Sequence, residues 1–142
     1  MKERYTIEKD GFVGYWHPAK GHDGKALIVF PGSGAGYELT RKGSEFFDFQ
    51  DGKFDFVTAF ETVFFWPDLS QNIREVYRVV KPKGRFAVIN NYGDPGIDWE
   101  KKVPCMKRRT AEEIKQFMED AGFANITIAK KDNLFLVIGE RE

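Results

Sequence analysis

Hydrophobic positions along the chain follow two periods, and polar turns separate the segments that carry them. Residues 26–30 form an unbroken apolar run closed by Pro31 and Gly32, which is typical of a strand buried on both faces of a sheet. After Asp68, apolar residues recur at the spacing of an amphipathic helix. The same reasoning predicts strands over 4–10, 11–17, 26–30, 54–60, 85–90, 124–130 and 133–139, and helices over 37–47, after Asp68 and from Thr110 to Gly122.

Local signals place the ends of these segments. The Lys81-Pro82-Lys83-Gly84 stretch stops the helix after Asp68, because proline cannot continue a helix and glycine tolerates the reversal. Thr110 and Glu113 have the spacing of a capping box. Strands that alternate with helices predict one α/β domain over 1–142, a Rossmann-like three-layer sandwich whose mostly parallel sheet ends in an antiparallel hairpin.

Composition narrows the class of protein. A chain of 142 residues can build one sizeable core, and its 22 basic and 22 acidic residues give no net positive charge for a nucleic-acid partner. The basic residues between Lys101 and Arg109 are expected to be solvated. A lone Cys105 fits a reducing cytoplasm and leaves no cysteine-rich metal site. No apolar run is long enough to cross a membrane, so no membrane partner is expected.

Three motifs in the second part of the chain resemble class I S-adenosylmethionine-dependent methyltransferases. Residues 54–62 are similar to the fourth strand of that fold and its following loop, and 75–84 (EVYRVVKPKG) resembles the signature before the fifth strand. Residues 110–123 resemble the last helix with its Ala-Gly-Phe exit. For residues 49–142 the resemblance implies a truncated methyltransferase fold, S-adenosylmethionine as the cofactor and a small molecule as the methyl acceptor.

The segment before it has a second resemblance. Residues 11–47 are similar to the opening strands of an α/β-hydrolase of the thioesterase kind, which would make residues 1–48 a foreign part joined to a methyltransferase. Ser33 lacks the G-x-S-x-G elbow that a hydrolase nucleophile needs, and both histidines, His17 and His22, come early. Hydrolase activity is therefore not expected. The join leaves open a non-catalytic fusion remnant or an engineered chimera that retains only the fold.

Gly32, Gly34 and Gly36 follow an apolar strand and precede a predicted helix, the placement of the glycine loop that holds the cofactor in methyltransferases. Glycines let the backbone turn sharply and approach a ligand, and a helix N-terminus favours a carboxylate such as that of S-adenosylmethionine. The acidic residues that flank this loop in the family, including the one that holds the ribose hydroxyls, are missing here. A tight turn without a ligand is the alternative interpretation.

The remaining candidate residues follow two predicted strands at the edge where open α/β sheets bind ligands. Phe60, Glu61 and Thr62 come after one strand and are predicted to border the cofactor, as the resemblance implies. Asn91 and Tyr92 come after another and, with Trp66, are predicted to face the acceptor. For Trp66 the alternative is a place in the core, and for Glu61 a capping or solvated carboxylate.

The strand at 26–30 raises the question of an open sheet edge. In complete methyltransferases the equivalent strand is central, and the strands on one of its sides are missing here. An unpaired apolar edge invites association, so we expect the N-terminal hairpin to cover it or two chains to form a homodimer there.

Overall fold

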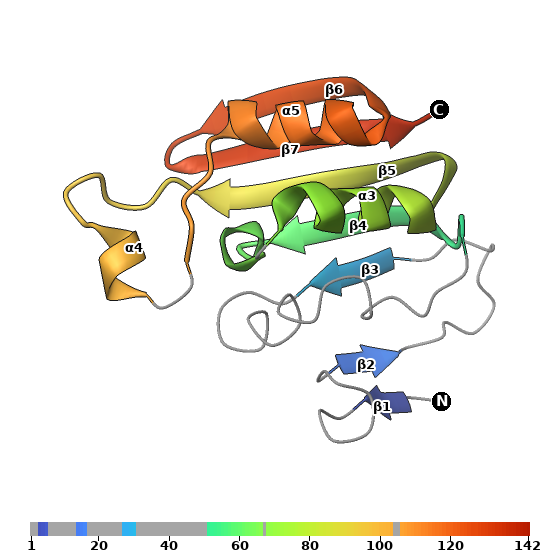
Figure 1. The fold of residues 1–142 in the computed structure, drawn as a ribbon, viewed down its shortest axis with the longest axis horizontal. Helices are drawn as coiled ribbons and strands as arrows, with labels where there is room; N and C mark the ends of the chain where they lie inside the picture. The colour runs from blue at the N-terminus through green and yellow to red at the C-terminus, as the bar shows by residue number, and fades with distance from the viewer. Residues whose placement is uncertain (1–2, 6–13, 17–26, 31–50, 67, 104–105) are drawn as a thin grey trace.

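The computed structural model describes the backbone of residues 3–5, 14–16, 27–30, 51–66, 68–103 and 106–142, and side chains from residue 51 onward. Figure 1 shows a sheet with two helices on one of its faces. The predicted helix over 37–47 and the three glycines, Gly32, Gly34 and Gly36, lie outside the described residues.

The main sheet has five strands in the order β3-β4-β5-β7-β6. β3, β4 and β5 are parallel, whereas β7 is antiparallel to both β5 and β6. The sheet is therefore mixed, and the α/β fold with an antiparallel C-terminal hairpin is confirmed. Its strands are β3 (Leu27–Phe30), β4 (Phe54–Phe60), β5 (Val80–Asn91), β6 (Phe123–Lys131) and β7 (Leu134–Arg141).

The N-terminal strands β1 (Glu3–Tyr5) and β2 (Gly14–Trp16) pair with each other in a separate antiparallel sheet. The predicted hairpin is thus present, with Glu3 opposite Trp16. Its strands are not hydrogen-bonded to β3, which remains the outermost strand of the main sheet within the described part of the chain.

Four helical segments of the described residues accompany the sheet, and three of them begin at a residue whose side chain accepts from a backbone N–H. Asp68 caps α3 by accepting from the backbone N–H of Gln71 at 3.0 Å, and Thr110 and Glu113 form the predicted capping box of α5. α3 and α5 lie on the same face of the sheet (Figure 1). The segments are the 3-10 helix η2 (Val63–Phe65), α3 (Leu69–Val79), the short α4 (Trp99–Lys102) and α5 (Ala111–Ala121).

The core fills the space between these two helices and the sheet. Phe86 of β5 lies at its centre, with ring centroids 6.4 Å from Trp66 and 5.7 Å from Phe123. Phe123 in turn makes an edge contact with Tyr77 of α3 at 5.0 Å. This row of aromatic rings joins α3 to β6 and to the middle strand β5.

The start of β5 differs from the prediction. α3 ends before Lys81 as expected, but the strand begins at Val80 rather than at Arg85. Val80 is opposite Phe54 and Arg85 is opposite Phe56, so the residues between them form a bulge on β5. Pro82 has no N–H to donate to a neighbouring strand, which confines it to such an irregular position. The sequence predicted that residues 81–84 only end the helix, because Pro82 disfavours regular structure there.

The C-terminal carbonyls of α3 are satisfied from two distant segments. Gly52 and Lys53, just before β4, donate to the carbonyls of Arg78 and Val79 at 2.8 and 2.7 Å. Arg141 at the end of β7 donates through Nη1 to the carbonyls of Tyr77 and Arg78, each at 3.0 Å, and to that of Val80 at 2.7 Å. Its guanidinium also lies 4.7 Å from the centre of the Tyr77 ring. The last strand is thereby tied to the helix that leads into β5.

Replacing Arg141 with Met should lower the free energy of unfolding by about 2 kcal/mol, because charge-assisted hydrogen bonds to partly buried carbonyls are lost while the apolar stem remains. Arg85→Met is the control, since its guanidinium is exposed and only 3.7 Å from Glu140, where an ion pair contributes little. Urea unfolding measures both variants, and equal stability of the two would contradict this role of Arg141.

Candidate functional site

The three parallel strands end together at one edge of the sheet. Phe30 of β3 pairs with Ala59 of β4, and Phe60 pairs with Ile89 of β5. The segments that leave these strands therefore start side by side, as ligand-binding edges of open α/β sheets require. In the sequence, Gly32, Gly34 and Gly36 come shortly after Phe30, the last residue of β3.

Glu61 joins the ends of β4 and β5. Its backbone N–H donates to the carbonyl of Ile89 at 2.9 Å, and its Oε1 accepts from the backbone N–H of Asn91 at 2.6 Å. The residue has a φ of +54°, a left-handed conformation that side chains other than glycine adopt at a cost. Such strain often accompanies binding sites. Here the carboxylate is held by the protein, which is the capping role that the sequence left open.

The segment after β5 is held at several points. Asn91 Oδ1 accepts from the N–H of Gly93 at 2.7 Å, and the N–H of Tyr92 donates to the carbonyl of Asn133 at 2.7 Å. Arg108 donates from its guanidinium to the carbonyl of Tyr92. Gly93 has a φ of +72°, and a Cβ there would lie 2.7 Å from the indole nitrogen of Trp99. The predicted acceptor loop is therefore a defined structure.

Tyr92 packs beneath this loop. Its ring centroid is 4.9 Å from that of Phe135, and Lys130 Nζ lies 5.8 Å from the ring centre. Lys130 also forms an ion pair with Glu112 at 2.7 Å. The hydrogen bond with Glu112, and secondly the neighbouring Tyr92, raise the pKa of Lys130, which therefore stays charged beside this ring.

The other predicted residues differ in exposure. The Phe60 side chain is 49% exposed and is available to a ligand. Thr62 is fully buried, and Trp66 is 3% exposed and stacked nearly parallel to Phe86. The structure thus supports the core interpretation of Trp66, whose ring faces other side chains.

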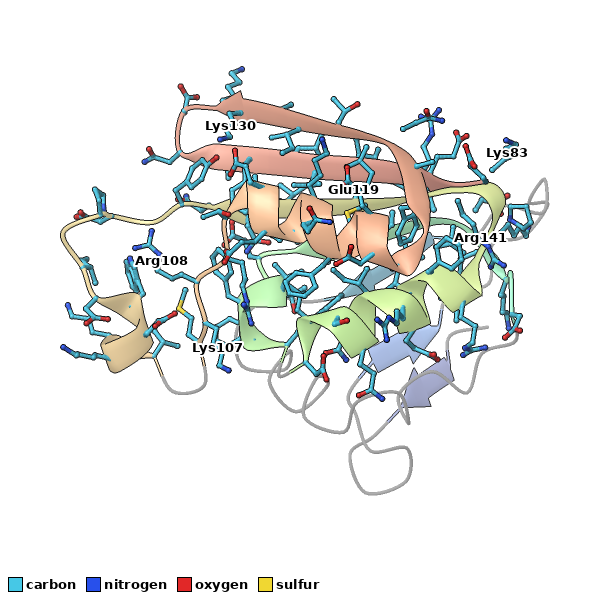
Figure 2. The ribbon with its side chains drawn as sticks, turned by 45° about the horizontal axis from the view of Figure 1, so that its top comes forward. Lys83, Lys107, Arg108, Glu119, Lys130 and Arg141 are labelled. Carbon is cyan, nitrogen blue, oxygen red and sulfur yellow. The ribbon has the colours of Figure 1, made fainter. Side chains whose placement is uncertain are left out.

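A basic segment borders the same edge. Figure 2 shows Lys107 and Arg108 between α4 and the start of α5. The N–H of Lys107 donates to the carbonyl of Phe64 at 2.7 Å, and that of Arg108 donates to Glu100 Oε1 at 2.9 Å. Arg109 lies 5.9 Å from the Phe117 ring centre. Lys107 and Arg108 are exposed, as expected. Through its hydrogen bonds to Phe64 and Tyr92, the segment also holds η2 and the loop after β5 in place.

No group of three or more metal-ligating side chains occurs in the part of the chain that the structure describes. In that same part, none of the helices combines the length and the apolar character that crossing a membrane requires.

The comparisons point to one fold. Residues 32–88 match the family model described as a methyltransferase domain. The match covers less than half of the chain and begins at Gly32, so it includes part of the segment that resembles a hydrolase. No comparison shows a hydrolase-like segment, and that resemblance stays a prediction. Among curated proteins, no sequence matches the chain significantly.

Solved structures agree with this match. A possible histamine N-methyltransferase from Thermotoga maritima is 21% identical with a TM-score of 0.61, and the similarity covers 70% of this chain and 61% of that one. Phosphoethanolamine N-methyltransferase 2 of Haemonchus contortus is 20% identical with a TM-score of 0.52, over 61% and 21% of the two chains. The geranyl diphosphate C-methyltransferase of Streptomyces coelicolor is 15% identical with a TM-score of 0.53, and the similarity covers 68% of this chain and 50% of that one. The protein is methyltransferase-like: it has a truncated methyltransferase fold that spans less than two thirds of these proteins' lengths.

Two features of the edge escaped the sequence analysis. Asn90, the residue before the predicted Asn91, has a fully buried side chain, and Arg108 reaches back to Tyr92 across 16 positions. A polar residue that continues the buried alternation of Phe86 and Val88 was the available signal for Asn90. Nothing local marked Arg108, because its contact depends on the path of the loop between β5 and α5.

Glu61 variants separate the hydrogen bond from the backbone strain. Glu61→Ala should be the least stable, since it loses the bond to Asn91 and keeps the left-handed backbone. Glu61→Gly loses the same bond but relieves the strain, so it should be more stable than Glu61→Ala by about 1 kcal/mol. Glu61→Gln retains an acceptor and is the matched control. Chemical denaturation gives the three values, and Ala as stable as Gly would argue against strain at this residue.

Proposed function

We propose that this chain binds S-adenosylmethionine at the edge formed by β3, β4 and β5 and that the site serves methyl transfer to a small molecule. The observation that carries the proposal is that the three strands end together at one edge of the sheet. The methyltransferase match covers residues 32–88 and includes Glu61, whose carboxylate bonds to Asn91 at this edge. Structural relatives crystallised with S-adenosylmethionine or S-adenosylhomocysteine support it.

The described residues fit part of such a cofactor. Phe60 offers an exposed aromatic surface for a flat base beside the start of the glycine segment. Glu61 is less suited to ribose hydroxyls, because one of its carboxylate oxygens already accepts from Asn91. When bound, S-adenosylmethionine would supply an electrophilic methyl group. The chain's own task is then to position and desolvate the two reactants, for which the anchored loop of Asn91, Tyr92 and Gly93 provides a wall.

A non-catalytic fold remnant is the second candidate. The absence of an acidic residue just before Gly32 in the sequence favours it. Binding without transfer is the behaviour that distinguishes this candidate from an enzyme.

Titration calorimetry with S-adenosylhomocysteine should give a dissociation constant weaker than about 1 μM. Each charge-assisted hydrogen bond to a ribose hydroxyl that the site lacks forgoes about 1.5–3 kcal/mol, or roughly tenfold to a hundredfold in affinity. A separate assay tests the hydrolase resemblance: the Ser33→Ala variant should hydrolyse an activated ester at the same rate as the unmodified protein. No heat of binding at millimolar ligand would refute the proposed site, and submicromolar binding would mean that a carboxylate such as Glu38, Glu45 or Asp48 holds the ribose.

We also propose that the N-terminal hairpin of β1 and β2 takes part in protecting the outer edge of β3, either within one chain or in a homodimer. In the described part, β3 has a neighbouring strand on one side only, and unpaired strand edges promote association.

Deleting residues 1–17, which removes both strands of the hairpin, should cause aggregation or change the oligomeric state. Deleting only Met1 and Lys2 is the control, because it leaves both strands intact. Light scattering coupled to size-exclusion chromatography measures the mass. A shortened protein with the mass and stability of the full chain would show that the edge is protected by something else.

A further inference from the structure

The described part has three buried polar side chains, and two of them come from neighbouring strand ends. They are Thr62 and Asn90, both 0% exposed, and Asn72, which is 6% exposed. Thr62 follows the end of β4, Asn72 is in the first turn of α3, and Asn90 is next to the last residue of β5. In Figure 1, η2 and the start of α3 lie at the end of the sheet to which the arrowheads of β4 and β5 point.

The strand ends bring Thr62 and Asn90 together. Glu61 donates to the carbonyl of Ile89 and accepts from the N–H of Asn91, so it lies beside Asn90, and Thr62 follows it directly. Asn90 continues the alternation of Phe86 and Val88, whose side chains are buried on the face covered by α3 and α5. The segment containing Thr62 turns over that face, since Trp66 stacks on Phe86.

Each of these side chains keeps polar atoms without a hydrogen bond in the described part of the chain. They are the Thr62 hydroxyl oxygen, Asn72 Oδ1, and both amide atoms of Asn90. Burying such groups without partners destabilises a fold, and most buried polar groups in proteins are paired. Two such exceptions, Thr62 and Asn90, at the ligand edge of the sheet therefore point to a partner that the described part of the chain does not supply.

The chemistry of the group selects the partner. A hydroxyl and two amides present donors and acceptors without charge, and no charged side chain of the described part is buried with them. A charged ligand group would lose its hydration here without a counter-charge. A neutral group that both donates and accepts, such as an amide, could pair with Asn90 and Thr62 together.

We infer that Thr62 and Asn90 form a neutral polar subsite that receives an amide or hydroxyl group of the methyl acceptor. This inference rests on the proposed function and deepens it, because it names the acceptor class. Asn90 is then a specificity-determining residue, which the chain retains at a cost in stability.

The variants Thr62→Val and Asn90→Leu test this cost. Each removes unpaired polar atoms and keeps the number and branching of the side-chain heavy atoms, so each should raise the melting temperature by about 3 °C. Thr127→Val is the matched control, because Thr127 is exposed on β6 and its replacement should leave the melting temperature unchanged. A lower melting temperature in both site variants would show that the groups are already satisfied, and would overturn the subsite.

Binding is tested on the ¹⁵N-labelled protein by NMR with acetamide at about 50 mM, a concentration suited to so small a ligand. Acetamide should shift the side-chain amide signals of Asn90 and the backbone signal of Thr62, whereas acetate and methylammonium should not. Asn90→Leu should lose the Thr62 response and Thr127→Val should keep it. A titration of the unmodified protein with S-adenosylhomocysteine separates the polar subsite from the proposed function. Cofactor binding without an acetamide response overturns only the subsite. No cofactor binding refutes the proposed function, and the assignment of the acceptor class with it.

Discussion

The structure depends on the junction between α3 and β5, where the helix reverses directly into the middle strand. Helix C-termini leave carbonyls without partners, and a junction this tight has no room to hydrate them all. Gly52, Lys53 and Arg141 satisfy them, and these residues come from the start of β4 and the end of β7. One set of hydrogen bonds therefore sets the relative positions of α3 and three strands.

Electrostatics strengthens the same junction. Arg78 hydrogen-bonds to Glu75 one turn earlier in α3 and to Asp51 before β4. Glu75 first, and Asp51 second, raise the pKa of Arg78 above its already high value, so the residue is charged under all ordinary conditions. Beyond the bulge, β4 and β5 keep one register from Phe56 opposite Arg85 to Phe60 opposite Ile89, and this register places their far ends side by side at the candidate site.

At the carboxyl ends of β4 and β5, several local features lower the stability of the fold. Glu61 adopts a left-handed backbone, and Thr62 and Asn90 carry buried polar atoms without partners in the described residues. At the opposite end the carbonyls of α3 are satisfied, although Arg141 Nε is buried without a partner and Lys83 is also left-handed. What distinguishes the carboxyl ends of β4 and β5 is that a left-handed residue and buried neutral polar side chains follow one another at an edge where open α/β sheets bind ligands.

The sequence by itself determined α3, α5 and, apart from the start of β5, the strands from residue 54 onward, because burial on one face imposes a period and local groups such as Asp68, Thr110 and Gly122 mark helix ends. It also determined that Phe60, Glu61, Asn91 and Tyr92 lie at strand ends. Only the tertiary structure decided that Glu61 bonds to Asn91, that Arg108 holds Tyr92, and that Asn90 is buried without a partner. These facts depend on contacts between residues far apart in the chain, and no local period or spacing encodes which side chains will meet there.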